Sequence, residues 1–186
     1  MPYRIVMNKD EIVEWCKKYD LEEDKYNKTL ELKLGNKLRS IRELDKNDLI
    51  SIFEWKFQGR LLGRRNRLLK LVKNVDDSTI KKIINTALNM DDDKSRIKKL
   101  MEISGVGVAL ASVVLTFHDP KKYGVFDIHV YDEVFCTDSK TRPKDLFSNL
   151  NYYIEFLRRL RGISNEYCID VRVVEKALFK KNLDKS

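Results

Sequence analysis

A pair of glycines in the segment 104–107, Ser-Gly-Val-Gly, could bind a ligand through the polypeptide backbone. Gly105 can adopt a positive φ and so end a preceding helix, and Gly107 has no side chain to block the approach of another backbone. An almost purely apolar stretch, residues 108–117, follows directly. A helix that begins there points free N–H groups beyond the turn, where an anion such as a phosphate is favoured. The segment therefore predicts a phosphate-binding turn between two helices.

An aspartate follows this turn and could supply a carboxylate to the same place. Asp127 comes 20 residues after Gly107, at the start of another predicted helix. A carboxylate in a dry cleft stabilises positive charge and can orient or deprotonate a water molecule. The alternative role is an ordinary helix N-cap, which is common for aspartate. The two roles are compatible, because a carboxylate held by amide groups stays ionised and fixed in direction.

The turn and the aspartate together resemble the motif of the helix-hairpin-helix–GPD superfamily of base-excision-repair DNA glycosylases. That motif runs roughly leucine-proline-glycine-valine-glycine-x-lysine-x-alanine, then a loop, then aspartate-threonine-histidine-valine. Here residues 103–111 read ISGVGVALA and residues 127–130 read DIHV, so the glycines, the last alanine, the aspartate, the histidine and the final valine match in place. Three positions depart from the motif: Ser104 replaces proline, Ile128 replaces threonine, and Ala109 stands where bifunctional members carry a lysine nucleophile.

The resemblance implies a DNA glycosylase that hydrolyses the N-glycosidic bond of a damaged or mispaired base. The base leaves the helical stack and the sugar becomes oxocarbenium-like, so Asp127 would stabilise the positive charge as the catalytic residue. A lyase step needs an amine that forms a Schiff base with the sugar, and Ala109 has none. We therefore expect a monofunctional enzyme that uses water. Lys121 and Lys122 are the only nearby substitutes in the sequence, and we expect both to face solvent.

Other residues are candidates for contacts with DNA. Residues 59–73 contain six cations and no acid, which we interpret as a phosphate-contact strip rather than as a solvated helix face. Gln58 is the candidate to fill the gap left by a flipped base, Trp55, Tyr123 and Phe126 are candidates for the base pocket, and His129 is expected to be structural or phosphate-facing. The predicted DNA-binding residues are Gly105, Val106, Gly107, Arg60, Arg64, Arg65 and Arg67.

Length, composition and charge fit a basic globular domain. The chain has 186 residues, of which 42% are hydrophobic and 35% charged, and its net charge of +8 points to a polyanionic partner. The three cysteines, Cys16, Cys136 and Cys168, are widely spaced, and only two histidines accompany them. We therefore expect no metal site and no iron–sulfur cluster. The hairpin carbonyls are a candidate site for a monovalent cation, and no other cofactor is expected.

We predict the cellular compartment from two features that the sequence does not show, a membrane-spanning run and a signal peptide. No apolar run is long enough to cross a bilayer, and the N-terminus does not have the layout of a signal peptide. We expect a monomeric cytoplasmic protein, associated with the nucleoid if its source is prokaryotic. The expected partner is double-stranded DNA containing a damaged or mismatched base, and no membrane partner is expected.

Helical periodicity along nearly the whole chain predicts an all-α fold. We expect a single domain over residues 1–186. The resemblance implies two helical lobes around a cleft with a helix-hairpin-helix DNA-binding motif. One lobe would contain residues 46–130 and the hairpin, and the other would contain residues 1–45 with 131–186.

Three local features bear on where the helices begin and end. Residues 28–37 are ambiguous between a helix, a strand and an extended arm, because hydrophobic and polar residues alternate there. We expect Pro143 in the first turn of a long helix that ends at Gly162, and Ser164 as the cap of the last helix.

Other classes of function stay open at this point. A non-catalytic helix-hairpin-helix DNA-binding protein is the alternative to an enzyme, because the lyase lysine is missing and the span from Trp55 to Gly105 is short for the family. A structured RNA-binding protein is a third class, with no aromatic-rich sheet motif to support it. Base release that depends on Asp127 would separate the first two classes. The identity of the excised base is open.

Overall fold

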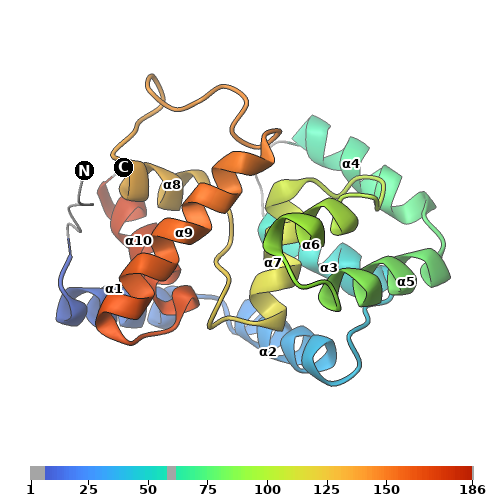
Figure 1. Cartoon of the computed structure of the whole chain (residues 1–186), viewed down its shortest axis with the longest axis horizontal. Coiled ribbons are helices and arrows are strands. Elements are labelled where there is room, and N and C mark those ends of the chain that lie inside the picture. The colour runs from blue at the N-terminus through green and yellow to red at the C-terminus, as the bar shows by residue number, and fades with distance from the viewer. Residues whose placement is uncertain (1–6, 58–61, 186) are drawn as a thin grey trace.

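The computed structural model describes residues 7–57 and 62–185, and in that part of the chain it contains helices and no strand (Figure 1). The prediction of an all-α fold is confirmed. The ambiguous residues 28–37 lie within a helix. The helices are α1 (Lys9–Glu22), α2 (Lys25–Ser40), α3 (Lys46–Lys56), α4 (Leu62–Asn74), α5 (Asp77–Leu88), α6 (Asp93–Leu100), α7 (Val108–His118), α8 (Ile128–Phe135), α9 (Leu150–Tyr167) and α10 (Val171–Lys185).

The helices gather into two groups in space (Figure 1). In one group α1, α8 and α9 each pack on α10, and in the other α7 packs on α2, α3 and α6. Every residue of α7 is buried except Ala109 and His118, as expected for a helix that is apolar all round. By its contacts α2 belongs with α7 and α3, whereas the expected division placed it with the chain termini.

Local capping chemistry fixes many of the helix starts. Asn8 and Asp45 are the N-caps of α1 and α3, and each forms a capping box with the residue three positions later, Glu11 or Asp48. Within residues 7–57 and 62–185, no helix combines the length and the apolar character that a bilayer crossing requires.

The predicted boundaries of the long helix near the C-terminus are wrong. Helix α9 begins at Leu150, where Asn149 accepts a hydrogen bond from the amide of Asn151, and not near Pro143. It continues through Gly162, because a single glycine inside a helix costs only about 1 kcal/mol and α9 buries an apolar face. Ser164 lies within α9, and its hydroxyl donates to the carbonyl of Ile169 rather than capping α10.

A buried arginine connects the two groups of helices. The Arg172 side chain, in the first turn of α10, makes a bidentate contact with Glu31 of α2, with Nε–Oε1 and Nη2–Oε2 distances of 3.0 and 2.8 Å. It also donates to Glu175, one turn further along α10. The backbone amide of Arg172 donates to the carbonyl of Pro120 at 2.9 Å, which fixes the segment between α7 and α8 at the same point.

Arg172 and Glu31 stabilise each other's ionised forms. Burial lowers the pKa of Arg172, but the adjacent Glu175 and Glu31 carboxylates raise it well above its ordinary value. Burial also raises the pKa of Glu31, but the guanidinium of Arg172 lowers it by more, and its pKa lies below the usual value. Arg172 and Glu31 are therefore both ionised at neutral pH, because each buried charge is stabilised by the other.

Replacement of Arg172 by methionine should lower the free energy of unfolding by about 3–5 kcal/mol, because it leaves buried carboxylates without their cation. Chemical denaturation followed by far-ultraviolet circular dichroism would measure the loss. Lys81→Met is the control, since the side chains of Lys81 and Asp77 are 42% and 45% exposed and solvent screens their ion pair, so the loss should be much smaller. Equal losses in the two variants would show that the Arg172 cluster does not hold the helices together.

Candidate functional site

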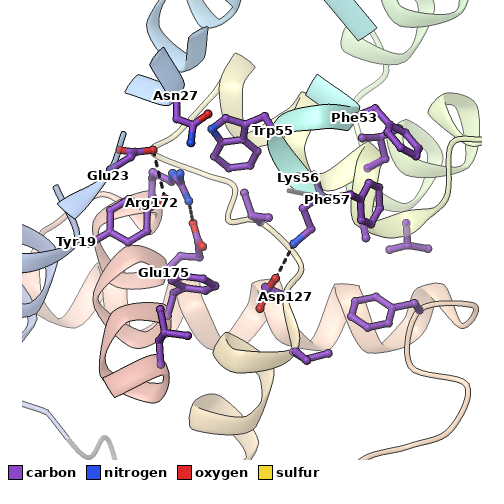
Figure 2. Close-up of a pocket in the computed structure, with 18 of the residues that line it drawn as sticks. Tyr19, Glu23, Asn27, Phe53, Trp55, Lys56, Phe57, Asp127, Arg172 and Glu175 are labelled. Carbon is purple, nitrogen blue, oxygen red and sulfur yellow. Dashed lines mark hydrogen bonds and ion pairs between the residues drawn. The ribbon is translucent and has the colours of Figure 1, made fainter. Parts of the chain in front are cut away.

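A cavity of about 600 Å³ opens between residues of α1, α2, α3, α7, α8 and α10 (Figure 2). Both groups of helices thus contribute to its walls. Four of the sequence-predicted residues line the cavity: Asp127, Trp55, and Gly105 and Gly107 of the turn. The structure therefore brings the glycine turn and the predicted catalytic aspartate to one cavity.

Asp127 is held by contacts to both of its carboxylate oxygens. It is the N-cap of α8, and its Oδ1 accepts a hydrogen bond from the amide of His129 at 3.0 Å. Its Oδ2 accepts from Nζ of Lys56, the last residue of α3, at 2.7 Å (Figure 2). The side chains of Lys56 and Asp127 are 8% and 19% exposed. The predicted capping contact is present, and the carboxylate is fixed in direction by two donors.

The electrostatic surroundings keep Asp127 ionised. Burial raises the pKa of its carboxyl group, because a charge is less stable away from water. The ammonium group of Lys56 and the backbone amide of His129 lower the pKa by more, so it lies below the usual value for aspartate. Asp127 is therefore an anion at neutral pH, although little of it is exposed.

The two glycines of the turn between α6 and α7 have different environments. Gly105 has a φ of 90°, and a Cβ atom there would lie 2.6 Å from the backbone oxygen of Leu68 in α4. Gly107 has extended backbone, supplies no side-chain cap to α7, and would have open space around a Cβ among the described residues. Gly105 is thus required for packing against α4, and Gly107 places no side chain over the start of α7.

Only some of the other predicted DNA-binding residues lie in the part of the chain that the structure describes. The side chain of Val106 is buried and its amide donates to the carbonyl of Ile103 at 2.9 Å, so this residue offers neither group to a ligand. Arg67 is exposed on α4, together with Lys70 and Lys73. Gln58 and Arg60 lie outside the described residues, as do the side chains of Arg64 and Arg65.

The prediction that Tyr123 and Phe126 line the pocket is wrong. Tyr123 is buried, and its hydroxyl donates to Asp93 at 2.8 Å and accepts from Arg96 at 3.0 Å. Phe126 is fully buried and contacts several aromatic rings, among them Phe156 with a centroid distance of 5.2 Å. Both side chains point into the core because the segment before α8 is covered by α9.

His129 has structural contacts. Its Nδ1 lies 2.8 Å from Oδ1 of Asn182, and its ring packs edge-on against Phe179 of α10 with a centroid distance of 5.5 Å. Of the two roles expected for His129, these contacts correspond to the structural one. Trp55, by contrast, lines the cavity, and its ring packs edge-on against Phe117 of α7 with a centroid distance of 5.1 Å.

Lys56 was missed by the sequence analysis, and its position changes the chemistry that the site can do. Lys121 and Lys122 are exposed as expected, but they are not the only amines near Asp127, because Lys56 reaches it from another helix. The helical spacing of the sequence could have identified Lys56 as a residue that faces inward. Leu49, Ile52 and Phe53 are buried at the i, i+3 and i+4 positions, and Lys56 occupies i+7 on the same face.

Glu23 is a second missed residue, at the part of the cavity where Figure 2 shows Asn27 and Trp55. Its side chain is 4% exposed. Its Oε1 accepts from the hydroxyl of Tyr19 at 3.3 Å, while its Oε2 has no hydrogen-bond partner among the described residues and lies 3.7 Å from Nζ of Lys176. Burial raises the pKa of Glu23, and the nearby Lys176 only partly offsets this effect.

Comparisons with protein-family models, with curated proteins and with solved structures found no match for this chain. The functional argument therefore depends on the residues and geometry of the cavity. Among residues 7–57 and 62–185, no group of three or more histidine, cysteine, aspartate or glutamate side chains is arranged to hold a metal ion.

Gly105→Ala should destabilise the fold by more than about 2 kcal/mol, because alanine disfavours a positive φ and its methyl group would clash with backbone in α4. Gly107→Ala should cost less than about 1 kcal/mol, since extended backbone suits any residue there. Thermal and urea unfolding of the two variants would measure the difference. If both variants lost the same stability, the different environments of the two glycines would have no energetic consequence.

Proposed function

We propose that this protein is a DNA glycosylase that hydrolyses the bond between a damaged or mispaired base and its sugar, with Asp127 as the catalytic carboxylate. The observation that carries the proposal is the position of Asp127. It is an ionised, nearly buried carboxylate held by two donors in the wall of a cavity large enough for a nucleotide. The resemblance of its sequence motif to that of the glycosylases adds support.

In this proposal Asp127 acts on the sugar. As the glycosidic bond lengthens, positive charge develops on the sugar, and a fixed anion in a poorly solvated site stabilises that charge more strongly than water would. The same carboxylate can orient the water molecule that attacks C1′. The Asp127 carboxylate needs no reorganisation for this role, because the amide of His129 and the ammonium of Lys56 hold it in place before substrate arrives.

The proposed DNA contacts come from the turn and from α4. We infer that α6, the turn and α7 act as a helix-hairpin-helix motif, with the amides of the first turn of α7 available to a phosphate next to Gly107. Exposed Arg67, Lys70 and Lys73 on the adjacent α4 would contact further phosphates. The two groups of helices would then form the two lobes of a cleft, with the cavity between them.

The end of the cavity near Trp55 is the proposed position of the flipped base. Trp55 offers an aromatic ring on which a base could stack. The Oε2 atom of Glu23, which has no hydrogen-bond partner among the described residues, could accept a hydrogen bond from an N–H group of the base, which would remove the cost of a buried oxygen without such a partner. Base selection would therefore depend on Glu23, whereas bond cleavage depends on Asp127.

Asp127→Asn should reduce base release by at least about 10²–10³-fold, because asparagine keeps the cap but loses the negative charge. Single-turnover excision would be measured on duplexes that contain alkylated purines, deaminated bases or mismatched thymine or uracil, with alkaline cleavage of the abasic product. The assay temperature is one at which circular dichroism shows the variant folded, since Lys56 loses its buried partner.

Asp76→Asn is the matched control, because Asp76 is also an N-cap aspartate, at the start of α5, and does not line the cavity. Wild-type rates in Asp127→Asn would make Asp127 a cap alone. DNA binding without base release in the wild type would favour the alternative, a non-catalytic helix-hairpin-helix DNA-binding protein.

Glu23→Gln should weaken excision of the preferred base by about 1–3 kcal/mol in kcat/KM, because the amide presents a different hydrogen-bonding pattern to the base. Affinity for a duplex with an abasic site should not change, since that ligand has no base to contact position 23. Glu14→Gln is the control, because Glu14 is in α1 and its side chain is 69% exposed. A uniform loss of affinity for both ligands would place Glu23 outside base recognition.

A further inference from the structure

We propose that Lys56 is an amine nucleophile, and that the protein cleaves the DNA strand at the abasic site that base release produces. This inference depends on the proposed function, and it adds a reaction that the sequence excluded by the alanine at position 109. The contact between Nζ of Lys56 and Oδ2 of Asp127, at 2.7 Å, is the observation on which it stands.

The position of Lys56 suits attack on a sugar aldehyde. Nζ reaches the same cavity as Ala109 but comes from the end of α3, whereas Ala109 is in the first turn of α7. A sugar placed against the Asp127 carboxylate would also lie against this amine. The Lys56 side chain is 8% exposed, so it is held in the wall of the cavity and does not extend into solvent.

The other described lysine that lines the cavity is less suitable. Nζ of Lys180 contacts the carboxylates of Glu22 and Asp184, at 2.6 and 2.5 Å, and neither acid is the predicted catalytic residue. Lys56, in contrast, contacts a single carboxylate in the described structure, and that carboxylate can accept and return its proton. Lys121 and Lys122 are exposed and do not line the cavity.

The first part of the reaction forms a covalent bond between protein and DNA. Lys56 transfers a proton from Nζ to Asp127 and becomes a neutral amine, which attacks C1′ of the ring-opened aldehyde at the abasic site. The carbinolamine that forms then loses its hydroxyl group as water, which takes the proton back from Asp127. The product is an iminium ion between Nζ and C1′, and the overall change releases one water molecule.

The second part breaks the DNA strand. The Asp127 carboxylate, again an anion, removes a proton from C2′, which is acidified by the adjacent iminium ion. The electrons of that C–H bond form a double bond between C2′ and C3′ as the C3′–O bond breaks, and the 3′ phosphate leaves with the electron pair of the bond. Water then hydrolyses the conjugated iminium ion, which returns Lys56 as its ammonium form and releases an unsaturated aldehyde on the 5′ fragment. Asp127 releases the proton from C2′ to solvent and is an anion again.

Borohydride trapping tests the proposal, because reduction of the iminium ion joins protein and DNA permanently. Wild-type protein incubated with a duplex that contains one abasic site should give a trapped complex, and proteolysis with mass spectrometry should place the adduct on residue 56. Lys56→Arg keeps a cation beside Asp127 but has no primary amine, so it should lose trapping and strand cleavage. Lys122→Arg is the control, because the Lys122 side chain is 70% exposed, and this variant should give the trapped complex at the wild-type level.

Failure of this inference can be separated from failure of the proposed function. If Lys56 only holds Asp127 in place, Lys56→Arg retains Asp127-dependent base release, and neither wild type nor variant is trapped. An adduct on any other amine, or trapping that survives in Lys56→Arg, would also overturn the role of Lys56. Base release is scored separately, by alkaline cleavage of lesion duplexes, so a glycosylase without strand cleavage would remain visible.

Discussion

The buried charge of Arg172 is the constraint on which the rest of the structure depends. An arginine residue that is only 5% exposed is stable in the interior because its guanidinium is paired with carboxylates, and here those carboxylates belong to two helices. Glu31 comes from α2 and Glu175 from α10, so the same ion cluster that satisfies Arg172 brings the two groups of helices together. Its backbone also holds the segment that leads to Asp127. The location of the cavity is thus fixed by the need to neutralise one buried cation.

The cavity contains a second charge pair with a different character. Lys56 and Asp127 are separated by 71 positions in the chain, and their contact is possible only because α3 and the start of α8 are held on opposite sides of one space. Arg172 and Glu175 also line the cavity, but Arg172 shares its donors between two carboxylates, whereas Lys56 contacts a single carboxylate in the described structure. In the proposed reactions a substrate beside this pair would meet both groups, while the Arg172 cluster supports the walls.

The turn between α6 and α7 shows that neighbouring residues of one motif can serve different physical purposes. Gly105 is needed inside the protein, because α4 passes too close to leave room for a side chain. Gly107 is needed, if the proposed DNA contact is correct, because the backbone must be approached from outside. A motif comparison gives these two glycines equal weight, and only their surroundings separate a role in folding from a role in binding.

The sequence by itself determined what depends on neighbouring residues. Periodic apolar positions indicated helices, and the apolar run at residues 108–117 indicated a helix directly after the glycine turn, because periodicity and capping act within a few residues. The same local chemistry made Asp127 a cap. Tertiary structure alone decided that Tyr123 and Phe126 face the core, that α9 starts after Pro143, and that Lys56 meets Asp127. Local patterns cannot specify such contacts, because the partners of Lys56 and Arg172 lie 71 and 141 positions away and depend on how all the helices pack.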